Sequence, residues 1–177
     1  MIEKTVSLSG QIQPDIIIDS MQDGDWEQVR AIYLEELATG QASFETEAPD
    51  WAHWDEAHLR HSRLVARDGG RVVAWAALTS MSRRRCYAGV AEVSIYVSAS
   101  HRGRGLGKRL LSKLVASSER HGIWTLFGST FPENEGSLRT LSACGFRLMG
   151  RRERIAQHHG VWRDTVITER RSKIVGV

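Results

Sequence analysis

Apolar and polar residues alternate between positions 92 and 98, where Val93, Ile95 and Val97 fall on one face of an expected strand. A few residues later, Leu106, Leu110, Leu111 and Leu114 recur with the spacing of one face of a helix. The glycine-rich stretch 102–108 joins the two segments. The pattern therefore predicts a strand that leads through a glycine-rich turn into the N-terminus of a helix.

Similar patterns predict the other elements. Strands are expected at residues 16–18, 64–66, 72–78, 93–97, 124–127, 147–155 and 161–168. Helices are expected at 26–37, from 50 onward, from 106 onward and at 136–144, with Asp23 and Asp25 as candidate N-caps for the first. His158, His159 and Gly160 form the turn of a final hairpin. We expect one domain over residues 15–170, a flexible extension over 1–14 and a basic tail over 171–177.

Composition and charge exclude several classes of function. The chain has 177 residues and a net charge of only +3, and its basic residues are not interleaved with aromatic ones, so no nucleic-acid partner is expected. The longest apolar run, residues 72–78, suits a buried strand and not a membrane span. The N-terminus lacks the apolar core of a signal peptide, which favours a cytoplasmic protein.

No metal site is expected either. The two cysteines, Cys86 and Cys144, lack the spacing of zinc ligands. His53, His58 and His61 have no evident carboxylate partner, so we interpret them as residues on the surface of the second helix.

The glycine-rich stretch has the chemistry of an anion site. Glycines let a ligand approach the backbone closely, and the first N–H groups of a helix have no partner inside it. With Arg102, Arg104 and Lys108 nearby, these groups suit a pyrophosphate. Neither a Walker loop nor a dinucleotide fingerprint fits, because Arg109 follows Lys108 and the glycines are spaced G-x-G-x-G. The alternative is a glycine-rich turn whose arginines are merely solvated.

Two motifs resemble the GNAT superfamily of N-acyltransferases. The first is R-x-x-G-x-G at Arg102, Gly105 and Gly107, and the second comprises Asn134, Ser137, Leu141, Gly145 and Phe146. The resemblance implies an α+β, three-layer fold with a mixed central sheet of six to seven strands and four helices. It also implies acetyl-CoA as co-substrate, in the gap where two central strands splay apart. The cofactor-binding residues that it implies are Ile95, Tyr96, Val97, Arg102, Gly103, Arg104, Gly105, Leu106, Gly107, Lys108, Asn134 and Ser137.

One position departs from the superfamily pattern. Many members carry a tyrosine at the position of Leu141, where it protonates the departing thiolate of CoA. Leucine has no proton to donate, so water or another side chain has to take this role.

Within the superfamily the chain resembles the phosphinothricin and methionine-sulfoximine N-acetyltransferases. The matching segments are residues 42–47, Arg84 with Tyr87, Glu92-x-x-x-Tyr96-Val97-Ser98, and His159-Gly160-x-Trp162-x-Asp164. The resemblance implies a homodimer that acetylates the α-amino group of a small, amino-acid-like substrate. It further implies that Phe44 and Thr46 line the substrate pocket, that Arg84 and Tyr87 hold the acid groups, that Glu92 is the base and that His159 assists.

The chemistry of amine acetylation agrees with a base at Glu92. An ammonium group must lose a proton before it attacks a thioester, and a carboxylate near a dry cleft can accept that proton. No Cys-His-Asp arrangement supports a covalent intermediate, so direct transfer in a ternary complex is expected. The structural alternatives are a solvated edge carboxylate for Glu92, a solvated Arg84, a core aromatic for Phe44 and a surface residue for His159.

Two other functions remain open. A non-catalytic acyl-CoA-binding module agrees with the missing tyrosine, but the apparently complete substrate loop argues against it. A peptide or protein N-terminal acetyltransferase is the second, although a bulky loop at Phe44 and the final hairpin favour a small substrate.

Overall fold

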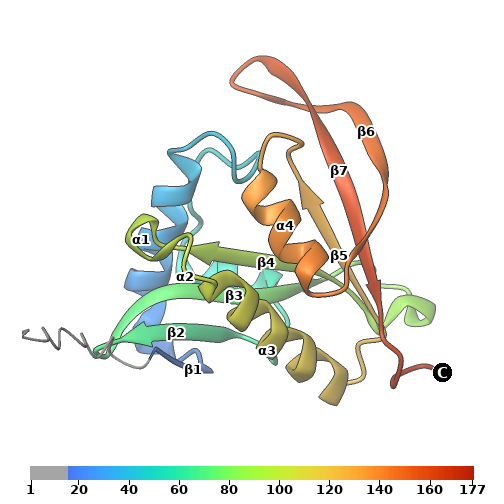
Figure 1. The fold of residues 1–177 in the computed structure, drawn as a ribbon, viewed down its shortest axis with the longest axis horizontal. Coiled ribbons are helices and arrows are strands. Elements are labelled where there is room, and N and C mark those ends of the chain that lie inside the picture. The colour runs from blue at the N-terminus through green and yellow to red at the C-terminus, as the bar shows by residue number, and fades with distance from the viewer. Residues whose placement is uncertain (1–15) are drawn as a thin grey trace, which may run out of the picture.

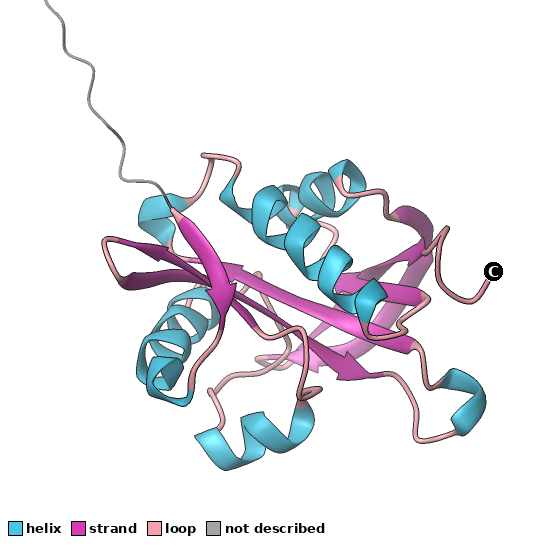
Figure 2. Ribbon diagram, turned by 90° about the horizontal axis from the view of Figure 1, so that it is seen from below, coloured by secondary structure: helices cyan, strands magenta, loops and turns pink. Residues whose placement is uncertain are grey.

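The computed structural model describes residues 16–177, so the predicted extension of residues 1–14 lies outside it. Seven strands form one mixed sheet in the order β1-β2-β3-β4-β5-β7-β6. The strands are β1 (Ile17–Ser20), β2 (Leu64–Asp68), β3 (Arg71–Ser80), β4 (Val90–Val97), β5 (Thr125–Thr130), β6 (Arg147–His158) and β7 (Val161–Arg171). The helices are α1 (Trp26–Leu37), α2 (Trp51–Ala57), α3 (Leu106–Arg120) and α4 (Glu135–Ala143). The predicted three-layer architecture with four helices is confirmed, since α1 and α2 cover one face of the sheet and α3 and α4 the other (Figures 1 and 2).

Strand β3 lies at the centre of the core. Residues 72–78 are all buried, as their apolar run predicts. Successive side chains alternate between the two faces: Ala74, Ala76 and Leu78 pack with the leucines of α3, whereas Trp75 and Ala77 pack with α1 and α2. Both faces of the central sheet are therefore covered, and this rigid layer carries the neighbouring strand β4.

Strands β4 and β5 separate halfway along β4. They pair in parallel over only three positions, Val90↔Thr125 to Glu92↔Phe127. Beyond this point β4 stays paired with β3 as far as Val97, and β5 stays paired with β7 as far as Thr130. The sheet therefore opens between β4 and β5 just after Glu92, as the resemblance predicts.

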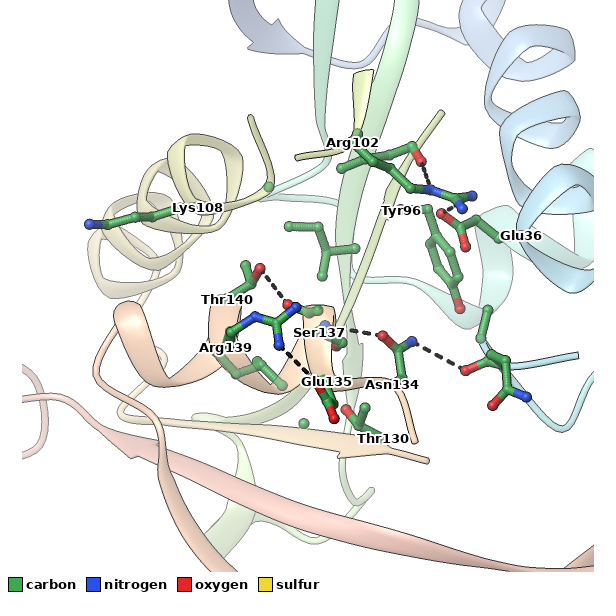
Figure 3. Close-up of a pocket in the computed structure, with 18 of the residues that line it drawn as sticks. Glu36, Tyr96, Arg102, Lys108, Thr130, Asn134, Glu135, Ser137, Arg139 and Thr140 are labelled. Atoms are coloured by element: carbon green, nitrogen blue, oxygen red, sulfur yellow. Dashed lines mark hydrogen bonds and ion pairs between the residues drawn. The ribbon is translucent and has the colours of Figure 1, made fainter. Parts of the chain in front are cut away.

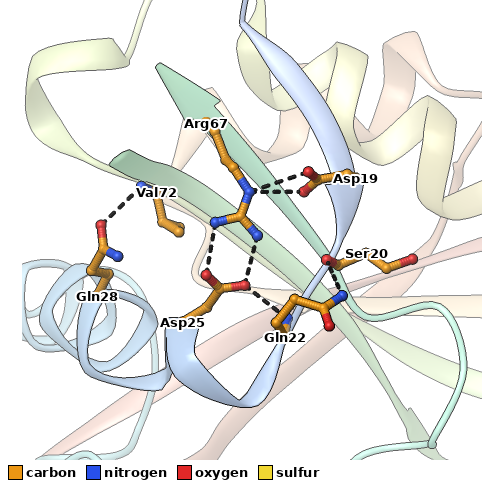
Figure 4. Close-up of polar contacts among 7 residues, drawn as sticks. All are labelled: Asp19, Ser20, Gln22, Asp25, Gln28, Arg67 and Val72. Atoms are coloured by element: carbon orange, nitrogen blue, oxygen red, sulfur yellow. Dashed lines mark hydrogen bonds and ion pairs between the residues drawn. The ribbon is translucent and has the colours of Figure 1, made fainter. Parts of the chain in front are cut away.

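The first turn before α1 differs from the prediction. Asp25 forms no side-chain cap on α1. Its carboxylate instead accepts a hydrogen bond from the backbone N–H of Gln22 at 2.7 Å and pairs with both terminal nitrogens of Arg67 at 2.7 and 2.8 Å (Figure 4). Arg67 also donates to Asp19, so one arginine of β2 joins β1 to the start of α1. An aspartate at the start of a helix need not cap it when a half-buried arginine lies within reach.

The interpretation of three surface histidines is wrong for His58. Helix α2 ends at Ala57, and His58 stacks on Trp54 with a centroid distance of 4.1 Å while its Nδ1 lies 2.7 Å from the carbonyl oxygen of Trp54. Burial lowers the pKa of His58. His53 is exposed as expected, and His61 lies beyond the helix, stacked on His121.

The C-terminal hairpin is longer than predicted. Its two-residue turn has positive φ at His159 (49°) and Gly160 (76°), the twist that suits tightly connected antiparallel strands. Strand β6 contains a bulge at which Arg154 has φ 45°, and the carboxylate of Asp164 accepts the backbone N–H of Arg154 at 2.7 Å. Asp164 therefore fixes the bend of β6.

Candidate active site

A cavity of about 820 Å³ lies where β4 and β5 separate. It is bounded by the ends of β4, β5 and α1 and by the N-terminal turns of α3 and α4 (Figure 3). Its volume is within the range of small-molecule sites, which is roughly 300–1,000 Å³.

The glycine-rich loop presents free backbone donors to this cavity. Gly103 and Gly105 have φ values of 73° and 75°, which side chains rarely adopt, and nothing lies within 4 Å of a Cβ built at either position. Gly105 is the N-cap of α3 and has no side chain that could accept a hydrogen bond. The N–H groups of the first turn, which have no partner within the helix, are therefore not capped by this residue. The positive end of the helix dipole lies at the same place. These features fit the pyrophosphate of a CoA ester, as the sequence predicts.

The predicted cofactor-binding residues gather around this cavity, with the exception of Arg104. The ones that line it are Ile95, Tyr96, Val97, Arg102, Gly103, Gly105, Leu106, Gly107, Lys108, Asn134 and Ser137. Arg104 is exposed and does not contribute to the lining.

Asn134 shapes the α4 side of the cavity. Its Oδ1 accepts the backbone N–H of Ser137 at 3.1 Å and so caps α4. Its Nδ2 donates to the carbonyl oxygen of Gln41 at 3.2 Å, which ties α4 to the segment after α1. Much of the hydrogen-bonding capacity of the Asn134 amide is therefore used in positioning backbone.

Glu92 lies at the point where the strands separate. It does not line the main cavity, but the next residue, Val93, does. Its side chain is half-buried, and this burial raises the pKa of the carboxyl group, while the positive charge of Arg152 on β6 lowers it. A carboxylate with a raised pKa is a stronger base than one in water.

The predicted substrate residues lie outside the main cavity, at three different locations. Thr46 and His159 line a second hollow of about 500 Å³, together with the last residues of α1. The ring of Phe44 packs edge-to-face on that of Phe131, with the ring centroids 4.9 Å apart, so Phe44 has a structural role as well. Arg84 and Tyr87 lie near each other, with the guanidinium 5.5 Å from the ring centroid, on an exposed turn that borders neither hollow.

Comparison with known proteins decides the family. The sequence model of the Acetyltransferase (GNAT) family matches residues 26–146. The chain belongs to the GNAT acetyltransferase family. It is 32% identical over 159 residues to phosphinothricin N-acetyltransferase of Alcaligenes faecalis, covering 85% of this chain and 79% of that one. It is 28% identical over 142 residues to an L-methionine sulfoximine/L-methionine sulfone acetyltransferase of Pseudomonas paraeruginosa, covering 77% and 83%.

A solved structure supports the same conclusion. The GNAT phosphinothricin acetyltransferase of Sinorhizobium meliloti, determined in complex with acetyl-CoA, has a TM-score of 0.82 and 27% identity to this chain. The alignment covers 91% of this chain and 90% of that one. The chain is thus a GNAT N-acetyltransferase.

This GNAT chain has an apolar residue at the end of its cavity. Leu141 is buried and lines the cavity, and its two δ-carbons lie 3.2 Å from a Cβ built on Gly128. The side chain at the position that the motif resemblance assigns to a proton-donating tyrosine is therefore buried and apolar.

Sequence reasoning missed several residues that line the GNAT cavity. Glu36, Thr39, Gln41, Glu133, Arg139 and Thr140 all contribute to it. A signal for Glu36 was present in the sequence, because Glu35 and Glu36 end α1 where the helix dipole disfavours acids. Such a pair indicates specific partners for the carboxylates.

Two further observations concern residues 16–177. They contain no group of three or more His, Cys, Asp or Glu side chains arranged to hold a metal ion. None of the helices in this part of the chain is long and apolar enough to cross a membrane.

Proposed function

We propose that the protein transfers the acetyl group of acetyl-CoA to the α-amino group of a small amino acid or analogue of the phosphinothricin or methionine-sulfoximine type. The observation that carries the proposal is the position of Glu92, a half-buried carboxylate at the mouth of the gap between β4 and β5. Relatives that act on phosphinothricin and methionine sulfoximine support the substrate class.

Acetyl-CoA supplies the thioester carbonyl that a free amine attacks. The N–H groups at the start of α3 would hold its pyrophosphate, and the unpaired edge of β4 from Val93 to Val97 would hold its pantetheine arm. No nucleophilic residue is needed in this scheme, so transfer is direct and both substrates are bound together. The free amine forms a C–N bond to the acetyl carbon, the C–S bond breaks, and CoA leaves as a thiolate that water or another side chain protonates.

Glu92 would take the proton of the incoming ammonium group. Burial favours the protonated carboxyl, so it raises the basicity of the side chain even though the charge of Arg152 acts in the opposite direction. His159 lines the second hollow beside Thr46 and would assist by orienting the amine or relaying the proton to water.

The acid groups of the substrate would bind to Arg84 and Tyr87. A guanidinium presents parallel N–H donors that match a carboxylate or phosphinate, and the Tyr87 ring already lies beside it. Phe44 and Thr46 would line the substrate pocket, Thr46 from the second hollow.

The proposed homodimer has a candidate surface on the C-terminal hairpin. Strand β6 is an edge of the sheet, and Leu148, Met149, Ile155, Val161 and Trp162 of the hairpin are all exposed. An exposed edge with this much apolar surface is unusual for a monomer. Light scattering of the purified chain measures the oligomeric state directly.

A substrate panel tests the proposed function. The chain would be assayed with acetyl-CoA and phosphinothricin, methionine sulfoximine, the common amino acids, an N-terminal peptide and a polyamine. We expect the highest kcat/KM for an amino acid or analogue with a free α-amino group. A preference for the peptide, or acetyl-CoA binding without turnover of any amine, would refute the proposal.

A further inference from the structure

We propose that Arg102 is a positioning residue, held by Glu36 against the end of β4, and that it does not itself bind the phosphates of acetyl-CoA. Of the basic residues that line the cavity, Lys108 is then the one that adds a charge to the phosphate site at the start of α3. This inference rests on the proposed function, because it concerns how the cavity holds acetyl-CoA. It gives the arginine of the R-x-x-G-x-G motif a role different from the direct contact that the sequence suggests.

The guanidinium of Arg102 is already occupied. Its Nε donates to the carbonyl oxygen of Val97 at 3.1 Å, and its Nη2 lies 2.8 Å from Oε1 of Glu36. Figure 3 shows the side chain extending toward Glu36 and away from Lys108. The Glu36 side chain is only 15% exposed, so water screens this pair less than a surface pair.

The other charged residues of the cavity support the same conclusion. Four cationic or titratable basic side chains line it: His101, Arg102, Lys108 and Arg139. Three of them lie against carboxylates, namely His101 at 3.0 Å from Asp68, Arg102 at 2.8 Å from Glu36 and Arg139 at 2.9 Å from Glu135. Within residues 16–177, Lys108 alone of the four makes no ion pair. Of the basic residues that line the cavity, Lys108 is therefore the one whose charge is not neutralised by a carboxylate, and it adds to the positive end of the helix.

Helix α1 holds the loop at a second point. Oε1 of Glu35 accepts the backbone N–H of Ala99 at 3.0 Å. Two consecutive glutamates thus reach from the end of α1 to the segment between β4 and α3. Acids at a helix C-terminus are unfavourable in isolation, so these contacts explain why α1 ends in this way. By fixing residues 97–102, they hold the N-terminus of α3 in place before a ligand binds.

Binding measurements on single and double variants separate the two roles of Arg102. Calorimetric titration with acetyl-CoA would compare wild type, Glu36→Gln, Arg102→Gln and the double variant. If Glu36 acts through Arg102, each single change should weaken binding by about tenfold and the double variant by no more than either. If Arg102 binds phosphate and Glu36 merely restrains it, Glu36→Gln should tighten binding, and the proposal would be overturned.

A conservative variant and a salt series make the distinction sharper. Arg102→Lys keeps the charge but replaces the two separate nitrogens that contact Val97 and Glu36 by a single one, so we expect a loss close to that of Arg102→Gln. Wild-type affinity from Arg102→Lys would contradict the positioning role.

The affinity of Lys108→Gln for acetyl-CoA should depend less on salt than that of wild type, whereas Arg102→Gln should keep the wild-type dependence. The reverse pattern would show that Arg102 is the phosphate ligand.

Two controls keep the outcomes separate. Arg120→Gln, an exposed arginine at the far end of α3, should leave the affinity for acetyl-CoA unchanged. Wild-type protein that fails to bind acetyl-CoA would refute the proposed function itself. Wild-type binding together with unaltered affinity in Glu36→Gln would refute only the role of Glu36.

Discussion

Glu92 of β4 lies opposite Phe127 of β5 in the last residue pair before the two strands separate. The carboxylate is thereby fixed at the boundary between closed sheet and open cavity. It is half-buried there, and its pKa is raised because burial disfavours the charged form. These conditions suit a general base.

Replacing Glu92 by glutamine tests this role. Glutamine keeps the shape and removes the basicity, so kcat should fall by roughly 10² to 10⁴-fold at pH 7, while acetyl-CoA affinity stays unchanged. The rate should recover partly at high pH, where free amine is abundant. Steady-state kinetics from pH 5 to 10 give both results. Near wild-type kcat across this range would rule out Glu92 and make His159 the next residue to examine.

The direction of the Glu92 pKa shift also predicts a pH profile. A base must be deprotonated to act, so activity should be lost as pH falls through a pKa that lies above the usual value of about 4.3. This acidic limb of kcat/KM should be absent in Glu92→Gln. A profile with the same acidic limb in both proteins would assign the limb to another group.

The glycine-rich loop gives a second prediction. Gly105→Asp places a side chain and a negative charge where the pyrophosphate would bind, so acetyl-CoA affinity should fall by at least about 100-fold. Part of any effect comes from strain, because φ at Gly105 is 75°. Gly122→Asp is a matched control, since Gly122 has φ 78° and open space around it but lies at the far end of α3. Calorimetry that finds equal affinities in the two variants would contradict the loop assignment.

Much of this architecture was predictable because local patterns agree with the fold. The buried run at residues 72–78, the leucine spacing of α3 and the turn at Gly160 each depend on periodicity or on a backbone preference. Errors arose where tertiary contacts determined a role. Asp25 pairs with Arg67, 42 positions further along the chain, and no local pattern reports such a partner.

The sequence predicted the parts of the candidate site that consist of backbone. The glycine-rich loop and the separation of β4 from β5 follow the motif, whereas the Glu36–Arg102 pair does not. This ion pair between α1 and the loop after β4 joins positions 66 residues apart. Its existence depends on how two layers of the fold meet, which a single sequence does not specify.

Arg84 gives a third prediction. Arg84→Ala should raise the KM for the amino acid by about ten- to 100-fold, because a bidentate contact to the acid group would be lost. Acetyl-CoA affinity should not change, since Arg84 lies outside the main cavity. Arg83→Ala, on the same exposed turn, is the control and should leave both constants near wild type. A parallel loss of both affinities in Arg84→Ala would indicate a structural role for the arginine.

The contact between Asp25 and Arg67 predicts how stability depends on pH. Hydrogen bonds from Arg67 lower the pKa of Asp25, so between the folded and unfolded pKa values the folded state binds fewer protons. The contribution of Asp25 should be complete above the unfolded value of about 3.9 and should disappear as pH falls through the lower folded value. Asp25→Asn should therefore reduce the free energy of unfolding by about 1.5–3 kcal/mol at pH 6, the usual range for a charged hydrogen bond.

Urea denaturation at several pH values should show that the difference in unfolding free energy between Asp25→Asn and wild type shrinks toward pH 2. Asp23→Asn, an exposed neighbour in the same turn, should match wild type throughout. A difference for Asp25→Asn that stays constant down to pH 2 would mean that the residue stabilises the fold through packing and not through its charge.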